Sequence, residues 1–283
     1  MLRIAGGMAA ALVLAVGGMS HAQTEPERTG GPYVPTPQVV VDQMLRIADV
    51  RADDYVIDLG SGDGVIVLTA AQQFKARGMG VDIDPELVKL ANQQAAKLGI
   101  ADRATFQVMD VFKADLSRAS VVTLYLLPGM MINLRPKIFL ELKPGTRVVS
   151  HDYHFDDWRA DDSISFDVPE KEKINGVPRA TVWLWIVPAR IAGRWNVAVE
   201  GGERYDVTWR QNYQVIDGTA QAGGRAVKLP GAALRGEQVE FALVSGSARQ
   251  VFKGVVSGDS MRGTVETGRG KTVRWTAVRA GPA

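Results

Sequence analysis

The residues of this chain best suited to chemistry lie where a short apolar run gives way to a glycine-rich turn. Positions 56–64 read Val-Ile-Asp-Leu-Gly-Ser-Gly-Asp-Gly, so that Asp58 is followed by alternating glycines. A strand, a tight glycine turn and a helix from Val65 form the layout that holds a nucleotide-like ligand at the carboxyl edge of a parallel sheet. A dinucleotide loop of the Gly-x-Gly-x-x-Gly type would need glycine in place of Val65, which disfavours a nicotinamide-dependent oxidoreductase.

Two further acids close the next predicted strands. Asp82 ends an apolar run and is followed by Ile83. Asp110 comes directly after the segment 104–109. An acid at the position of Asp82 is placed to accept hydrogen bonds from ribose hydroxyls, and Ile83 could pack on an adenine face. Three acids at three successive strand ends form a specific pattern, whereas any one of them alone would be a weak signal.

The loop with its aspartate resembles motif I of the class I S-adenosylmethionine (SAM) methyltransferases. That resemblance implies SAM as the cofactor, with Asp58 near its ammonium group, and with Asp110 at the adenine amino group beside Val111. Because glycine has no Cβ, it permits close backbone approach to the methionine part. The loop positions concerned are Gly60, Ser61, Gly62 and Gly64.

Residues 33–158 resemble one branch of that superfamily more closely. The branch contains the mitochondrial lysine methyltransferases that act on the ATP-synthase c-subunit and on adenine nucleotide translocase and, more distantly, the non-SET histone-lysine methyltransferases. The resemblance rests on Tyr33-Val-Pro-Thr36, the glycine loop, the run 121–142 and the segment 144–150. It implies that Tyr33 and Thr36 lie on a lid near SAM, and that the acceptor is a protein lysine or another amine.

The fourth strand is where the acceptor of such enzymes usually meets the methyl group. Many amine and amide methyltransferases carry Asp/Asn-Pro-Pro-aromatic there, but this chain reads Leu124-Tyr-Leu-Leu-Pro128. Tyr125 is the only polar side chain of this stretch and is a candidate catalytic residue, or else a half-buried strand tyrosine. Pro128 would shape the turn.

A polar segment follows the fifth predicted strand and could rim the same face. His151 with Asp152 could deprotonate the substrate, since histidine titrates near neutrality. The alternative is a polar loop that caps the sheet. No metal site is predicted, because nothing fixes a third ligand. The segment consists of His151, Asp152, Tyr153, His154, Asp156, Asp157 and Trp158.

Alternating strand and helix patterns predict the fold class of residues 33–188: α/β, with a doubly wound, seven-stranded Rossmann-like methyltransferase sheet. The predicted strands are 54–58, 78–83, 104–109, 120–126 and 146–151, with a closing antiparallel hairpin of 163–169 and 179–187. One predicted helix begins at Thr36-Pro37, and three more are predicted over 64–75, 85–98 and 129–142.

Residues 189–283 have a different character. Short alternating runs separated by turn residues predict a small antiparallel all-β domain, either a sandwich or a small barrel. Trp195, Trp209 and Trp275 are expected in its core. The domain offers no acid pair, histidine cluster or nucleophile, and we interpret it as a binding or oligomerisation module.

The first residues predict export. Met1–Ala22 combine Arg3, an apolar stretch and small residues before a cleavage site, which is typical of a secretory signal peptide. Residues 23–32 would be a linker. The expected location is periplasmic or secreted, or tethered to the inner membrane if the signal is not cleaved. An exported SAM enzyme needs its cofactor to reach that compartment; otherwise the fold serves another ligand there.

Composition narrows the partners. The formal net charge of +2 gives no nucleic-acid footprint, and the absence of cysteine excludes disulfides and thiolate chemistry. The leading hypothesis is a SAM-dependent methyltransferase. The alternative is a non-catalytic exported binding protein that joins a retained SAM fold to a β recognition module.

Overall fold

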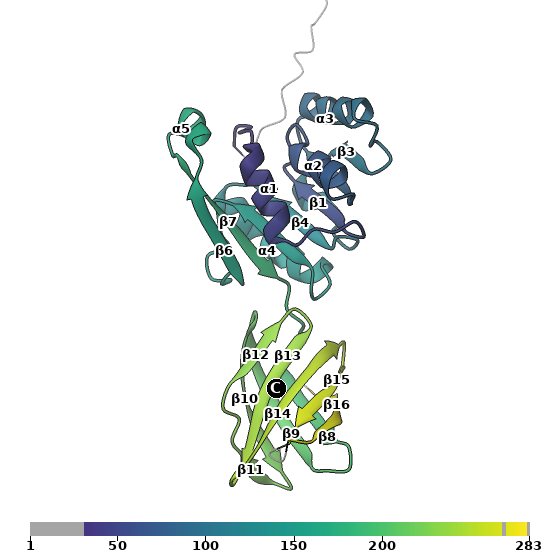
Figure 1. The fold of residues 1–283 in the computed structure, drawn as a ribbon, viewed down its shortest axis with the longest axis vertical. Helices are drawn as coiled ribbons and strands as arrows, with labels where there is room; N and C mark the ends of the chain where they lie inside the picture. Colours follow the sequence, from purple (N-terminus) through teal and green to yellow (C-terminus); the bar gives the residue numbers. More distant parts are fainter. Residues whose placement is uncertain (1–30, 268–269, 282–283) are drawn as a thin grey trace, which may run out of the picture.

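The protein forms two bodies stacked along its long axis (Figure 1). The structure is a computed structural model and describes residues 31–267 and 270–281. The predicted signal peptide 1–22 lies outside the described residues, as does the predicted linker up to residue 30. Each body is built on its own sheet, and the first sheet ends with strand β7 (Arg179–Ile186) shortly before the second begins with β8 (Gly193–Val199).

The first body is the predicted doubly wound sheet. Its seven strands follow the order β3-β2-β1-β4-β5-β7-β6. The first five are parallel, and β7 runs antiparallel to both β5 and β6. The remaining strands are β1 (Tyr55–Leu59), β2 (Arg77–Asp82), β3 (Ala104–Val108), β4 (Val121–Leu124), β5 (Arg147–His151) and β6 (Asp162–Asp167). The predicted fold class is therefore confirmed.

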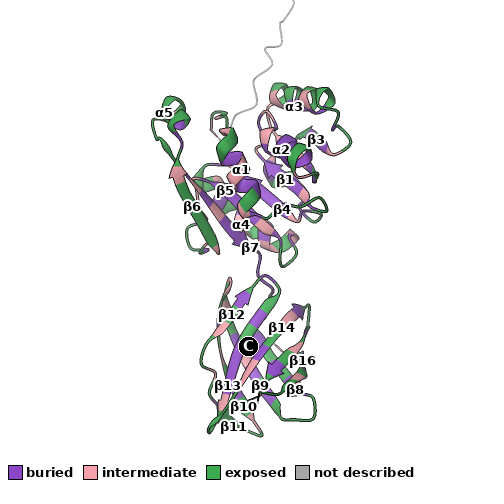
Figure 2. Cartoon of the chain, in the orientation of Figure 1, coloured by how far each residue is buried: buried purple, intermediate pink, exposed green. Residues whose placement is uncertain are grey.

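Helices cover both faces of this sheet. Helices α1 and α2 pack their apolar sides against Val56, Val121 and Val149, whereas α4 packs against Leu59 and Leu124 on the other face. Helix α3 turns a largely exposed side to solvent (Figure 2). The four helices are α1 (Gln38–Ile47), α2 (Val65–Gln73), α3 (Pro85–Lys97) and α4 (Pro128–Glu141). Two short elements that the sequence did not predict are a 3-10 turn, η1 (Val111–Lys113), and α5 (Pro169–Asn175).

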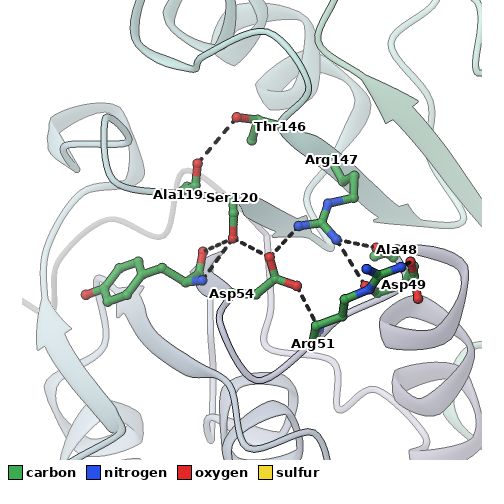
Figure 3. A network of polar contacts seen from close by, with 9 residues as sticks. Ala48, Asp49, Arg51, Asp54, Ala119, Ser120, Thr146 and Arg147 are labelled. Atoms are coloured by element: carbon green, nitrogen blue, oxygen red, sulfur yellow. Dashed lines mark hydrogen bonds and ion pairs between the residues drawn. The ribbon is translucent and has the colours of Figure 1, made fainter. Parts of the chain in front are cut away.

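A partly buried ion pair stabilises the amino edge of the sheet (Figure 3). Asp54 accepts hydrogen bonds from the Ser120 hydroxyl, at 2.7 Å, and from the Arg147 guanidinium. Arg147 also donates to the carbonyl oxygens of Ala48 and Asp49, at the end of α1. Burial alone would raise the pKa of Asp54, but these hydrogen bonds lower it below its ordinary value. The network thus joins the starts of β1, β4 and β5 to α1.

The second body is a single nine-stranded antiparallel sheet of order β11-β10-β9-β8-β16-β15-β14-β13-β12. Lys228, just after β11, pairs with Val244 of β13, so the sheet curls until its two ends meet. The remaining strands are β9 (Arg204–Asn212), β10 (Val215–Ala222), β11 (Arg225–Val227), β12 (Ala232–Arg235), β13 (Gln238–Ser245), β14 (Ala248–Ser257), β15 (Ser260–Glu266) and β16 (Thr272–Gly281). Of the two predicted forms, this single curled sheet corresponds to the barrel.

Aromatic side chains fill the inside of the curl. Trp195, Trp209 and Trp275 are at most 1% exposed, which confirms them as core residues. Phe241 packs edge-on against two of them and stacks on Phe252 at 4.6 Å between ring centroids. Each buried indole needs a hydrogen-bond acceptor for its N–H. Trp195 finds one in the carbonyl of Ile191, at 2.8 Å.

Candidate active site

A pocket of about 320 Å³ opens at the carboxyl edge of the first sheet. It is formed where β1, β2, β3, β4 and β5 end, the position at which parallel sheets of this topology bind ligands. The predicted site residues that line it are Tyr33, Thr36, Asp58, Gly60, Ser61, Gly62, Asp82, Ile83, Asp110, Val111 and Tyr125. The structure thus brings together residues that lie up to about ninety positions apart in the chain.

Asp82 fastens the glycine loop. One of its carboxylate oxygens accepts a hydrogen bond from the Gly62 amide at 2.8 Å, and the other from the Asp84 amide at 2.9 Å. The amides of Gly60 and Ser61 donate to the carbonyl oxygen of Val81. Each Asp82 oxygen has a second lone pair available for a ligand. The acid predicted to hold the ribose therefore also holds the loop in place.

Asp84 has a structural role at the start of α3. Its carboxylate accepts hydrogen bonds from the amides of Glu86 and Leu87, which caps α3 with Pro85 as the first helical residue. It also lines the pocket. Asp110 acts similarly at η1, where it accepts from the Phe112 amide at 3.0 Å.

Tyr33 lies directly over the glycine loop. A Cβ at Gly62 would collide with the Tyr33 ring, and the backbone φ of 52° at Gly62 also favours glycine. Burial, together with the neighbouring Asp63, raises the pKa of the Tyr33 phenol above its ordinary value. Gly31 and Pro32, within the segment predicted as a linker, line the pocket beside Tyr33. The segment before α1 is thus one wall of the pocket.

Asp58 is the most deeply buried acid of the pocket, at 2% exposure. It lies level with Thr123 on the adjacent strand β4, and the Thr123 hydroxyl donates to its Oδ1 at 2.7 Å. Its Oδ2 has no hydrogen-bond partner among the described residues, and the same holds for the hydroxyl of Ser61. Burial raises the pKa of Asp58 to about 7, and the hydrogen bond from Thr123 opposes that rise. A cationic group on a ligand would relieve this cost, as the ammonium of SAM does in the predicted arrangement.

Three of the predicted site residues do not line the pocket. Gly64 lies behind the loop, where a Cβ would meet Phe106 and Ala91. Pro128 is the first residue of α4, and its neighbours Leu126 and Leu127 line the pocket instead. His151 lies behind Tyr125, with their ring centroids 4.0 Å apart.

The position of His151 does not suit a general base. It is 1% exposed, and neither ring nitrogen has a hydrogen-bond partner among the described residues. Its Nε2 lies 3.5 Å from a carboxylate oxygen of Asp152, which in turn binds the buried Lys171. Burial lowers the pKa of His151, and the Asp152 carboxylate only partly offsets this. The imidazole is therefore neutral at physiological pH, and it contacts the pocket-lining Tyr125 without lining the pocket itself.

The loop after β5 contributes one residue that was expected only as part of a polar rim. Tyr153 lines the pocket, and its ring is nearly parallel to that of Tyr125, with 6.3 Å between centroids. Met109, Leu126, Leu127 and Met130 add apolar surface. Sequence reasoning missed these four because apolar side chains carry no chemical signature.

The described residues contain neither a metal-binding cluster nor a membrane-spanning helix. No group of three or more histidine, cysteine or acidic side chains is arranged to hold a metal ion in residues 31–267 and 270–281. Within the same ranges, no helix combines the length and the apolar character needed to cross a bilayer. The polar groups of the pocket fit SAM, because buried oxygens of Asp58 and Ser61 that have no partner among the described residues lie beside a glycine loop.

Comparison with known proteins gives a consistent result. Residues 58–162 match the ANTKMT methyltransferase domain. A protein-lysine N-methyltransferase of Saccharolobus islandicus (strain REY15A) is 41% identical over 157 residues, which are 55% of this chain and 93% of the relative. The ATP synthase c-subunit lysine N-methyltransferase of Mus musculus is 34% identical over 131 residues, 46% of this chain. This chain spans about half of that mouse protein, 52% of its length.

Similarity also extends to solved structures. One of them is an RNA methyltransferase from Salinibacter ruber in complex with S-adenosyl-L-homocysteine, 47% identical, with a TM-score of 0.51. The match covers 56% of this chain and 96% of the other. The pocket, its acids and these relatives agree on SAM as the cofactor, and the chain belongs to the ANTKMT family of class I SAM-dependent methyltransferases.

Proposed function

We propose that the protein transfers a methyl group from SAM to the side-chain amine of a protein lysine. The observation that carries the proposal is the division of one pocket into an acidic part and an aromatic part. Asp58, Asp82 and Asp110 lie at the ends of β1, β2 and β3, whereas Tyr125 and Tyr153 lie at the ends of β4 and β5. The lysine acceptor is supported by what the names of the archaeal and mouse relatives state for those proteins.

SAM supplies an electrophilic methyl group on a sulfonium centre. In this chain Asp58 would hold the ammonium end, Asp82 the ribose hydroxyls and Asp110 the adenine amino group. Ile83 and Val111 would pack on the adenine ring. Tyr33 and Thr36 would close over the loop and shield the reacting atoms from water, which strengthens the electrostatic interactions inside the pocket.

The first experiment is calorimetric titration of the full chain with SAM and S-adenosyl-L-homocysteine, with NAD as the control. We expect micromolar binding of both SAM compounds, none of NAD, and loss of binding in Asp58→Ala. Asp82→Asn should weaken SAM binding by about 1–3 kcal/mol, typical of hydrogen bonds to a charged group. Unchanged affinity in that variant would remove Asp82 from the cofactor site.

The acceptor is tested separately. Lysine-containing peptides and RNA are incubated with the enzyme and SAM labelled in its methyl group, and label in each acceptor is counted. Label on peptide lysine supports the proposal, whereas label on RNA alone would favour the activity named for the Salinibacter ruber relative. Failure of the chain to bind SAM or S-adenosyl-L-homocysteine would leave the non-catalytic binding protein as the better interpretation.

We also propose that this enzyme acts after export. The support is the pattern of Met1–Ala22, with one basic residue before an apolar stretch and small residues at its end. Cell fractionation with a C-terminal tag, combined with the mass of the purified chain, tests this. A cytoplasmic protein that retains residues 1–22 would contradict it.

A further inference from the structure

We infer that Tyr125 and Tyr153 form the surface that receives the acceptor amine, and that Asp152 is the positioning residue that places Tyr153 there. The inference rests on the proposed function, because it takes an alkyl amine as the acceptor. We call these two tyrosines the aromatic wall.

The order of strands separates the aromatic wall from the part of the pocket given to SAM. From one edge inward the strands run β3, β2, β1, β4, β5. Asp110, Asp82 and Asp58 therefore follow one another along the carboxyl edge, and Tyr125 and Tyr153 continue that row. The three acids would take the ammonium, the ribose hydroxyls and the adenine amino group of SAM. The side chains beyond them, Leu127 and Met130 included, are apolar or phenolic.

An unusual turn brings Tyr153 to this position. Asp152 has a φ of 62°, in the left-handed region that non-glycine residues seldom adopt. Its amide donates to the carbonyl of Thr181 at 2.7 Å, and its carbonyl accepts from the Trp183 indole at 3.1 Å. The Tyr153 amide then donates to the carbonyl of His151 at 2.8 Å. A strained residue held by this many contacts is more typical of a functional site than of a connecting loop.

The Asp152 side chain also stabilises this turn. One carboxylate oxygen accepts from the Thr181 amide at 3.1 Å, and the other from the ammonium of Lys171 at 2.5 Å. Lys171 is only 1% exposed and donates also to the carbonyl of Arg179. A lysine is rarely buried unless it is paired. The buried pair therefore fixes the backbone from which Tyr153 reaches the pocket.

His151 supports the wall from behind. The His151 ring lies against the ring of Tyr125, and His151 itself does not line the pocket. A neutral, buried imidazole at that place fixes the plane of Tyr125 and takes no proton from the substrate. The structure thus assigns His151 a packing role and leaves the aromatic wall as the chemical surface.

The aromatic wall suits both protonation states of an alkyl amine. An apolar surrounding disfavours the ammonium form, so the amine loses its proton to water as it enters and arrives with a free lone pair. The methylated product is cationic, and the electron-rich faces of the two rings attract it. No base inside the pocket is needed for this sequence, in agreement with the position of His151.

The test measures binding without turnover. The full chain, saturated with S-adenosyl-L-homocysteine, is titrated with Nε-trimethyllysine amide and, as a neutral contrast, Nε-acetyllysine amide. We expect the cationic probe to bind more tightly. Tyr125→Leu and Tyr153→Leu should each weaken it about three- to thirtyfold, as expected for loss of a cation–π contact. Tyr125→Phe and Tyr153→Phe keep the ring and should restore most of the affinity.

Two controls make the outcome decisive. Leu140→Ala changes a residue of α4 that is 77% exposed, and should leave probe binding unchanged. Asp152→Gly keeps the left-handed turn but removes the carboxylate, and should weaken the probe without weakening S-adenosyl-L-homocysteine. Equal binding of the probe by wild type and both leucine variants would overturn the inference and leave the proposed function standing. If the wild-type protein does not bind S-adenosyl-L-homocysteine at all, that result would instead count against the proposed function.

Discussion

The Trp158 indole donates a hydrogen bond to the side-chain carbonyl oxygen of Gln214 at 3.0 Å, and this bond joins the two bodies of the protein. Gln214 also donates to the carbonyl of Arg159, at 2.5 Å. Beside it, Tyr213 packs on Trp158 and Phe139. The tip of the β9–β10 hairpin therefore packs against α4 and the loop between β5 and β6 of the first body.

Removal of this contact should loosen one body from the other. Tyr213→Ala deletes two ring contacts and a hydrogen bond to Asp157, which together are worth about 1–3 kcal/mol. We expect the calorimetric unfolding transition to broaden or split, because the two bodies then unfold less cooperatively. Val215→Ala, in the same hairpin at a residue that is 57% exposed, is the matched control. A single unchanged transition in Tyr213→Ala would mean that the hairpin contributes nothing to the coupling.

The buried Asp58 predicts a trade between stability and binding. Its pKa is raised to about 7 in the folded protein, against about 4 in an unfolded chain. The folded state therefore binds the Asp58 proton more tightly than the unfolded chain does. The stabilisation of the fold by this proton is fully present below pH 4 and is lost as the pH rises through about 7. We expect Asp58→Asn to raise the melting temperature of the ligand-free protein at pH 8 and to raise it less at pH 5.

The same variant should lose SAM, because an amide cannot offer the cofactor a negative charge. Melting curves of wild type and Asp58→Asn at both pH values, with and without S-adenosyl-L-homocysteine, measure the two effects together. Equal melting temperatures of the two proteins at pH 8 would show that Asp58 is charged at little cost in the fold.

The contact between Gly62 and Tyr33 predicts the effect of one added methyl group. Gly62→Ala should displace the Tyr33 ring and strain a backbone with φ of 52°, at a cost of about 1–3 kcal/mol. SAM binding should fall sharply. In Gly62→Ala with Tyr33→Ala the collision is removed and only the strain remains, so part of the stability should return. Thermal melts of the three variants check this, and additive losses would contradict it.

Much of the fold follows from patterns that the chain displays locally. The apolar runs ending at Asp58, Asp82 and Asp110 predicted three strands and the acidic half of the pocket, because a strand end fixes where its last side chain lies. Helix α5 was missed because this polar helix of only seven residues between β6 and β7 has no apolar face. The positions of Tyr153 in the pocket and of Tyr213 against the first body depend on contacts between segments far apart in the chain. A local sequence pattern does not indicate such contacts.

The amino-edge network should make acid stability depend on Arg147. Hydrogen bonds lower the pKa of Asp54, so they stabilise the fold above the ordinary carboxyl range, and that stabilisation is lost as the pH falls through the lowered value. Arg147→Met should cost about 1–3 kcal/mol at pH 7 and less at pH 3. Arg51→Met breaks an exposed pair and should change the stability little at either pH. Urea unfolding at both pH values distinguishes the two.

The pairing of Lys228 with Val244 has a consequence for solubility. A sheet that meets its own end offers neighbouring molecules few unpaired backbone groups, so the nine-stranded body is protected against edge-to-edge association. The other sheet keeps two edge strands, β3 and β6, and β6 is exposed along most of its length (Figure 2). Asp162 and Asp167 stand at its two ends, where like charges on two molecules repel. We expect these two carboxylates to oppose pairing of β6 with the same edge of a second molecule.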